Sequence, residues 1–418
     1  MLSCMHEHDG PLTRLRRGHE QAVLELLRKH GPLSRAELGA RSGLSRTTLH
    51  DIVGGLVGSG SVVAGTPHVE VRRRGRPVEK LSLNPAAGEA VGIDFARRAV
   101  HVAAVNFAHE VLGSASESHG AELSWPARVD IAARLLATLT AGAPVAPATE
   151  AGRRDGSDGS DPVRLDALSA IGVGVVGPIT DPGSVDARAQ GIDGLPELLR
   201  ERFGVPVLLD NNTRLAALAE AVWGAAADSG DVLYLRLSHG VGGGLVVGGA
   251  LHRGPGGLSG EFGHITVDPA GRRCGCGGTG CLETRASLDA VLRRYREAGG
   301  RADDLAGFLD AAAAGEPAAL DVLERVGHDI GGVLAAVCQA VGPGVVVVGG
   351  ELAEAGPALL EPVVLALRRR LMPLARRHVD VRRATLGEAG SALGGIALVL
   401  HESPLLSHYP RPVSEENA

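Results

Sequence analysis

Residues 260–283 have the sequence GEFGHITVDPAGRRCGCGGTGCLE, which places one histidine and three cysteines within eighteen residues. These four are His264, Cys274, Cys276 and Cys281, and the cysteines lie among glycines. Imidazole nitrogen and thiolate sulfur are the ligands of structural zinc sites, and four of them complete a tetrahedron with no open position. The spacing therefore predicts one structural Zn²⁺ as a cofactor, with three incidental thiols as the alternative interpretation.

A glycine-rich segment precedes this loop. Residues 237–245 have the sequence LSHGVGGGL, and Gly254 follows. Together with the GEFGH and CLE stretches quoted above, these residues closely resemble the motifs of the ROK family. The name of the family stands for repressors, open reading frames and sugar kinases. The resemblance extends from about residue 91 to residue 400. It implies an actin-like (ribonuclease H-like) fold with two α/β lobes around a sugar cleft and a zinc loop beside the sugar.

The fold class of the body also follows from its own pattern. Short β-branched runs such as 171–176 and 345–348 alternate with helical stretches such as 320–341. Alternating strands and helices are typical of an α/β architecture. The sequence therefore predicts an α/β domain over 90–402, interrupted at 142–163 by a flexible insertion rich in Ala, Pro, Gly, Ser and Asp.

By the same resemblance, five polar residues would contact the sugar. A polyol needs carboxylates and amides around it, because many hydroxyl groups must find hydrogen-bond partners at once. His264 would bind zinc through one ring nitrogen and direct the other at the sugar, which would couple the metal to the ligand. The residues that the resemblance assigns to the sugar are Asn211, Asn212, Glu261, His264 and Glu283.

Three departures distinguish this chain from the kinases of the family. Asp94 is followed by FARR where a kinase has Asp-x-Gly-Gly-Thr, and residues 238–240 are SHG in place of Gly-Thr-Gly. The catalytic aspartate of a kinase falls on Asn212, and a neutral amide cannot accept the proton of a sugar hydroxyl. The pattern therefore favours a regulator that is not an enzyme. An ATP-dependent hexose or amino-sugar kinase is the alternative, and a regulator controlled by a protein partner is a third interpretation.

The first part of the chain, residues 14–84, has the pattern of a winged helix-turn-helix. Ser34 and Glu37 form a capping box at the start of a second helix. A third helix starts at Ser45, and its apolar residues recur at helical spacing. The apolar stripe is Leu49, Ile52, Val53 and Leu56. The residues of this helix that would reach base edges or phosphates of DNA are Ser45, Arg46, Thr47 and His50.

An arginine-rich turn, residues 72–77 (RRRGRP), lies between two expected short strands. A narrow A·T minor groove attracts inserted arginine, so Arg74 and Arg76 are predicted to bind there. Residues 11–84 carry a net charge of +7, whereas residues 85–418 carry −11 in a chain of net charge −6. A basic head on an acidic body fits double-stranded operator DNA as the partner of the head. A three-helix protein-interaction module is the alternative.

The composition of the chain indicates the cellular compartment of the protein. No apolar stretch approaches the roughly 18–20 residues that span a bilayer, and the first residues lack the apolar core of a signal peptide. Five cysteines in 418 residues are too few for a disulfide scaffold. These features predict a cytoplasmic protein with no membrane partner.

These features together predict a sugar-responsive transcriptional regulator. By analogy with the regulators of the family, we expect a repressor that a sugar or sugar derivative releases from its operator. One helix-turn-helix contacts too little DNA to define a specific site, and dimers of such units bind two-fold operators. We therefore expect a homodimer or a homotetramer.

Overall fold

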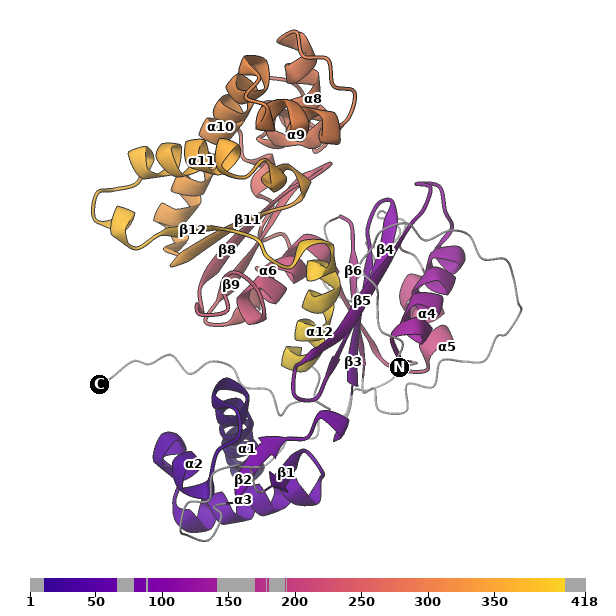
Figure 1. Ribbon diagram of the computed structural model, residues 1–418, viewed down its shortest axis with the longest axis vertical. Helices are drawn as coiled ribbons and strands as arrows, with labels where there is room; N and C mark the ends of the chain where they lie inside the picture. Colours follow the sequence, from indigo (N-terminus) through magenta and orange to yellow (C-terminus); the bar gives the residue numbers. More distant parts are fainter. Residues whose placement is uncertain are drawn as a thin grey trace.

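The computed structural model describes residues 11–65, 79–87, 89–140, 170–177, 179, 192 and 194–402. It contains a small head and a body of two lobes, each lobe built on a five-stranded sheet (Figure 1). Within these ranges, no helix is long and apolar enough to cross a membrane. The expected insertion at 142–163 and the arginine turn at 72–77 lie outside the described residues.

The head consists of three helices and a two-stranded antiparallel sheet, in the order expected from the sequence. Its elements are α1 (Pro11–His30), α2 (Arg35–Ser42), α3 (Arg46–Gly58), β1 (Val62–Gly65) and β2 (Lys80–Leu83). The capping box is present, because the Ser34 hydroxyl accepts from the Glu37 amide while the Glu37 carboxylate accepts from the Ser34 amide. The expected apolar stripe of α3 is buried in one core with Leu38 and Leu81. Helix α1 begins eight residues before the expected start at His19.

The sheet of the first lobe has the strand order β5-β4-β3-β6-β7. Its strands are β3 (Glu89–Phe95), β4 (Ala99–Asn106), β5 (Val111–Ser118), β6 (Ile171–Val175) and β7 (Val207–Asn211). The first three form an antiparallel meander, and β6 and β7 continue the sheet in parallel. Helices α4 (Trp125–Thr140) and α5 (Leu195–Phe203) pack together on one face of the sheet, as Figure 1 shows.

The sheet of the second lobe repeats this plan with the order β10-β9-β8-β11-β12. Its strands are β8 (Val232–Leu237), β9 (Val241–Val247), β10 (Ala250–His252), β11 (Val345–Gly349) and β12 (Asp380–Arg383). Its helices are α7 (Glu283–Ala286), α8 (Leu288–Glu297), α9 (Leu305–Ala313), α10 (Pro317–Val341) and α11 (Pro357–Arg370). Short 3₁₀ helices are η1 (Pro85–Ala87), η3 (Phe262–His264), η4 (Glu351–Ala355), η5 (Ala375–Arg377) and η6 (Gly387–Ala389). Two sheets with the same strand order confirm the predicted two-lobed α/β body.

Two helices, α6 (Asn212–Val222) and α12 (Gly390–Glu402), pack against each other between the two sheets (Figure 1). Helix α12 is the last described element, yet it covers the sheet of the first lobe, and the sequence pattern did not predict a helix there. It approaches that sheet so closely that a Cβ atom on Gly172 would lie 1.8 Å from the carbonyl oxygen of Gly395. Glycine is therefore required where α12 crosses β6.

Adding one methyl group at this crossing should separate the helix from the sheet. We expect Gly172→Ala to lower the free energy of unfolding by about 2–3 kcal/mol, because the backbone of α12 must move to admit the Cβ. Urea denaturation measures this. Gly120→Ala is the matched control, since a Cβ there would meet no atom within 4 Å. Equal stabilities of the two variants would contradict the proposed packing constraint.

Candidate functional site

A cleft of about 830 Å³ lies between the two lobes, and all five residues predicted to contact a sugar line it. Asn211 and Asn212 lie at the junction of β7 and α6, in the first lobe. Glu261 and His264 follow β10, and Glu283 begins α7, so these three come from the second lobe. The fold thus brings together residues that are up to 72 positions apart, from the two lobes.

The side chain of Asn211 forms hydrogen bonds with the backbone around it. Its side-chain oxygen accepts from the amides of Thr213 and Arg214 and so caps α6. Its side-chain nitrogen donates to the carbonyl of Gly177 at 2.7 Å. One side-chain amide hydrogen of Asn211 remains for a ligand. The main role of Asn211 is therefore to fix the backbone that forms the cleft wall.

Asn212 pairs with a buried carboxylate. Its side-chain nitrogen donates to Oδ1 of Asp94 at 3.2 Å, and both residues are almost fully buried. Burial raises the pKa of Asp94, although the nearby guanidinium of Arg236 acts in the opposite direction. Two carboxylates at this separation would repel each other, whereas an amide can donate a hydrogen bond to its neighbour. An amide at position 212 can therefore form a hydrogen bond with Asp94 where an aspartate would repel it.

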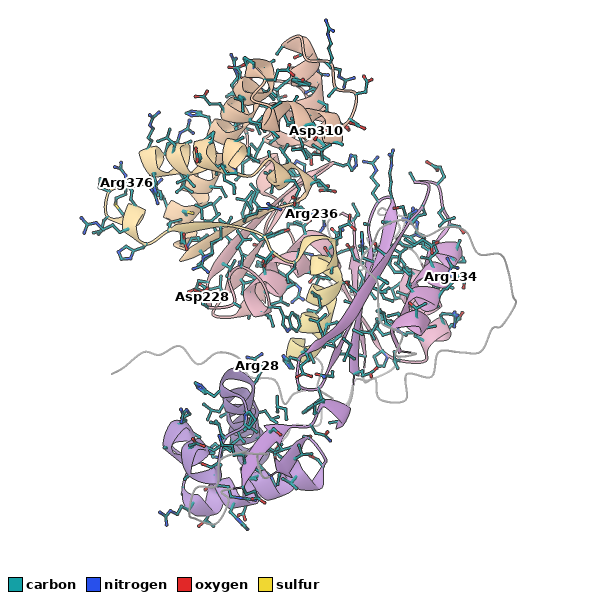
Figure 2. All side chains as sticks on the ribbon, viewed as in Figure 1. Arg28, Arg134, Asp228, Arg236, Asp310 and Arg376 are labelled. Carbon is teal, nitrogen blue, oxygen red and sulfur yellow. The ribbon has the colours of Figure 1, made fainter. Side chains whose placement is uncertain are left out.

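Arg236 lies between the lobes, where Figure 2 labels it, and it lines the cleft. Its Nη1 donates to the Ser391 hydroxyl at 3.3 Å. Asp94, Glu351 and the phenol of Tyr234 favour its charged form, although burial opposes it. Arg236 therefore neutralises the acidic side chains that enter this half of the cleft.

A second buried charge network was not anticipated from the sequence. Arg214, 2% exposed, donates from Nε to Oδ1 of Asp210 at 2.8 Å, and it also donates to the carbonyls of Gly257 and Ile179. Arg253 donates to the other oxygen of Asp210. The network ties the start of α6 to the segment that leads to Glu261. An acid and an arginine four residues apart, at positions 210 and 214, are the only sequence signal for it.

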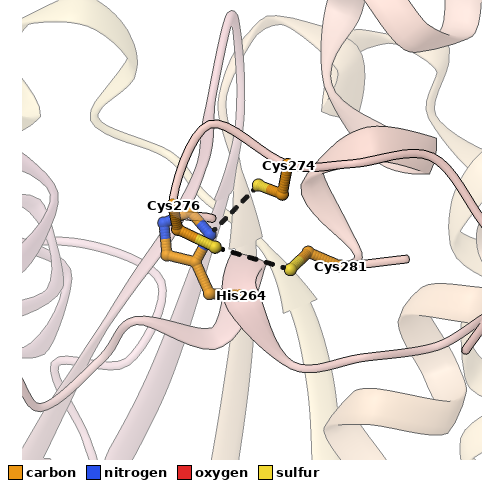
Figure 3. Close-up of side chains that lie close together, drawn as sticks. All are labelled: His264, Cys274, Cys276 and Cys281. Carbon is orange, nitrogen blue, oxygen red and sulfur yellow. Dashed lines mark hydrogen bonds between the residues drawn. The ribbon is translucent and has the colours of Figure 1, made fainter. Parts of the chain in front are cut away.

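The predicted zinc ligands are brought together in the second lobe, as Figure 3 shows. The ligand atoms of His264, Cys274, Cys276 and Cys281 all lie within 4.8 Å of one another. His264 Nδ1 is 3.6 Å from the sulfur of Cys274, and the sulfurs of Cys276 and Cys281 are 3.7 Å apart. Tetrahedral zinc with Zn–S bonds of about 2.3 Å places its ligand atoms about 3.8 Å apart. The four residues could therefore hold a zinc ion, and they fit its donor preference.

The metal cluster and the cleft share His264, and Glu283 of the cleft lies against the cluster. Glu283 accepts from the amide of Val241 at 3.1 Å through one oxygen, and its other oxygen is 3.7 Å from the sulfur of Cys274. His264 has its Nδ1 on the cluster side, and its Nε2 is 3.8 Å from a Glu261 oxygen. A bound metal ion would supply structural rigidity here, since four protein ligands leave no position for a substrate. It would thereby hold Glu283 and His264 at the cleft.

The residues predicted to contact DNA lie at the surface of the head where the structure describes them. Arg46, Thr47 and His50 are exposed on α3, whereas Ser45 caps that helix and accepts from the amide of Thr48. The remaining two, Arg74 and Arg76, lie outside the described residues.

The sequence signature of the ROK family matches residues 160–402, which is more than half of the chain. The chain belongs to the ROK family. Among proteins similar to this ROK chain is the DNA-binding transcriptional repressor Mlc of Escherichia coli K12, 25% identical over 93% of the chain and 94% of its own length.

Two solved structures place this ROK chain among known folds. A ROK family transcriptional regulator, described as a homologue of the E. coli Mlc protein, has a TM-score of 0.74 at 24% identity and covers 94% of this chain and 97% of its own. The ROK hexokinase from Thermus thermophilus has a TM-score of 0.60 at 30% identity and covers 74% of this chain and 97% of its own. The regulator therefore matches a larger share of the chain than the hexokinase does.

We expect the purified protein to contain one zinc ion per chain and Cys276→Ser to lose it, because three ligands bind zinc more weakly than four. Elemental analysis under reducing conditions measures the stoichiometry. Cys338→Ser is the matched control, since Cys338 is buried in α10 away from the cluster. Wild-type protein without stoichiometric zinc would refute the assignment.

Proposed function

We propose that this protein is a DNA-binding transcriptional regulator, a repressor that leaves its operator when the cleft binds a sugar or sugar derivative. The observation that carries the proposal is the hydrogen bond from Asn212 to Asp94. By the family resemblance, position 212 is where a kinase needs a carboxylate to accept a proton from the substrate, and the hydrogen bond supports an amide donor there. A cleft with this arrangement can bind a polyol but lacks that general base.

The surroundings of Asn212 support binding without phosphoryl transfer. Arg97 and Arg98 are exposed and line the cleft in the turn after β3, where the family's kinases have Gly-Gly-Thr. The Ser238 hydroxyl in the second altered loop donates to Glu351 at 3.0 Å. The bulky side chains of Arg97 and Arg98 thus occupy a turn in which small residues would be needed, because only small residues let the backbone come close to a nucleotide phosphate.

The head supports the DNA-binding half of the proposal. We assign residues 14–84 to a winged helix-turn-helix and residues 90–402 to a ligand-binding and oligomerisation domain that acts in the cytoplasm. Arg46, Thr47 and His50 would read bases in the major groove. Ser45 would contact phosphate near the helix start, and Arg74 and Arg76 would enter the minor groove. Full-length similarity to the Mlc repressor agrees with this assignment.

A sugar kinase is the second candidate, because the hexokinase of T. thermophilus is 30% identical over most of the body. An ATP-coupled assay with a panel of hexoses and amino sugars separates the two functions. We expect no sugar-dependent formation of ADP. Turnover in wild-type protein that Asn212→Ala abolishes would establish the kinase instead.

Removing one cleft carboxylate should abolish the response to ligand. Thermal-shift screening of a sugar library identifies ligands that stabilise the wild type, because binding adds RT ln(1 + [L]/Kd) to its stability. We expect Glu261→Ala to lose the shift, since this carboxylate would accept sugar hydroxyls. Glu297→Ala on α8 is the control, because it removes the same carboxylate from an exposed position that does not line the cleft. An undiminished shift in Glu261→Ala would move the sugar site elsewhere.

Arg46 should contribute base recognition. After selection of a binding duplex from a random library, we expect Arg46→Ala to weaken binding to it by about 1–3 kcal/mol and to relax the preferred sequence. Fluorescence anisotropy at physiological salt measures the affinity. Arg325→Ala, an exposed arginine on α10 of the body, should bind like the wild type. Unaltered sequence preference in Arg46→Ala would show that α3 does not read the bases.

A further inference from the structure

The head contacts the first lobe through an aromatic side chain. Phe107 follows β4, in the turn that leads to β5, and it packs against the hydrophobic core of the head that contains Val53 and Leu56. In Figure 1 the head lies next to the end of the first lobe's sheet where this turn is found. A movement of the turn would therefore move a side chain that belongs to the packing of the head.

The turn itself, Asn106–Glu110, has a defined conformation. The Asn106 side chain donates to the Glu110 carboxylate at 2.8 Å and accepts from the Glu110 amide at 3.0 Å. His109 has a φ of 66°, and it is the only non-glycine residue with a positive φ among the described residues. A non-glycine residue in this region costs conformational energy and persists only where its surroundings hold it. The turn is thus built to keep His109 in one place.

The ring of His109 contacts the far end of α6. Its centroid lies 6.1 Å from that of Trp223, with an angle of 51° between the rings. Trp223 is the residue at which α6 ends, and it packs against the cores on both sides of the helix. A displacement of the C-terminal end of α6 would therefore reach the ring of His109.

The other end of α6 lies in the cleft. The helix begins at Asn212, which lines the cleft, and its eleven residues span about 16 Å. Its interior is buried between α12 and the second lobe, so the helix has little freedom to bend. At its end, the carboxylate of Glu220 accepts from the amides of Thr385 and Leu386, which ties it to the segment before α12.

We propose that Phe107 and His109 are positioning residues that couple the cleft to the head, with α6 as the rigid connection. A ligand that favours one position of α6 would shift Trp223, then the turn, and then the packing of the head. A ligand can bias such an equilibrium only through different affinities for the two positions. The inference rests on the proposed function, because it assumes that the cleft and the head are the two sites that communicate.

A double-mutant cycle on the full chain tests the coupling without ligand or DNA. Asn211→Ala removes the cap at the cleft end of α6, and His109→Gly removes the ring while glycine keeps the positive φ without strain. Hydrogen exchange of the Ile52 and Val53 amides in the head is the readout. We expect Asn211→Ala to speed this exchange by about fivefold or more when His109 is present, and by less than about twofold in His109→Gly.

Two controls and a second variant of the turn separate coupling from a general loss of structure. Asn211→Ser retains a capping oxygen and should exchange like the wild type. Val111→Ala, next to the turn with an exposed side chain, should leave the response to Asn211→Ala intact. Phe107→Ala should remove it as His109→Gly does. A purely structural role for His109 would change exchange in the single variant but not the factor by which Asn211→Ala acts.

Two results would overturn the inference. One is an Asn211→Ala effect on the head that is the same with and without the His109 ring. The other is wild-type exchange in the head of Asn211→Ala. Neither depends on sugar or DNA binding, so failure of the proposed function in the thermal-shift and anisotropy measurements is distinguishable from failure of the coupling.

Discussion

The backbone contact between α12 and the sheet of the first lobe is the constraint on which the remaining geometry depends. At Gly92 and Gly172 a carbonyl oxygen of α12 occupies the place of a Cβ atom, and Gly394 meets the carbonyl of Leu215 in α6 in the same way. Sheet, α12 and α6 therefore approach each other backbone to backbone at these glycines, and buried side chains pack around the contacts. This stacking sets the distance between Asp94 on β3 and Asn212 on α6, and hence the hydrogen bond that defines the cleft.

The two buried aspartates next to Asn211 and Asn212, Asp210 and Asp94, have different partners. Asp210 pairs with two arginines and serves to fix backbone, so removing its carboxylate would leave Arg214 and Arg253 without their shared ion-pair partner. Asp94 receives an amide hydrogen bond, and its second oxygen has no hydrogen-bond partner in the described part of the chain. The first aspartate is held by ion pairs, whereas the second leaves a buried acceptor next to Asn212, which lines the cleft.

Local chemistry explains which features were predictable from the sequence. The capping serines, Ser34 and Ser45, and the clustered metal ligands act over a few residues, so their patterns are visible in the chain. The cleft residues were assigned through resemblance to the ROK family, since no local pattern links Asn212 with Glu283. Helix α12 was missed because Gly394 and Gly395 lower its intrinsic helix propensity, and only the close packing in the folded protein compensates for this. The partners of Arg214 likewise exist only after folding.

The position of α12 in the chain has a consequence for synthesis on the ribosome. The head can fold as soon as β2 has emerged, because all of its core residues except Phe107 come from the first 83 residues. The sheet of the first lobe begins at Glu89, yet the helix that covers one of its faces follows roughly 300 residues later. At about 5–20 residues per second, that face stays uncovered for about 15–60 s. A nascent chain therefore carries a finished head on an unfinished lobe, a stage at which chaperones would find exposed apolar strands.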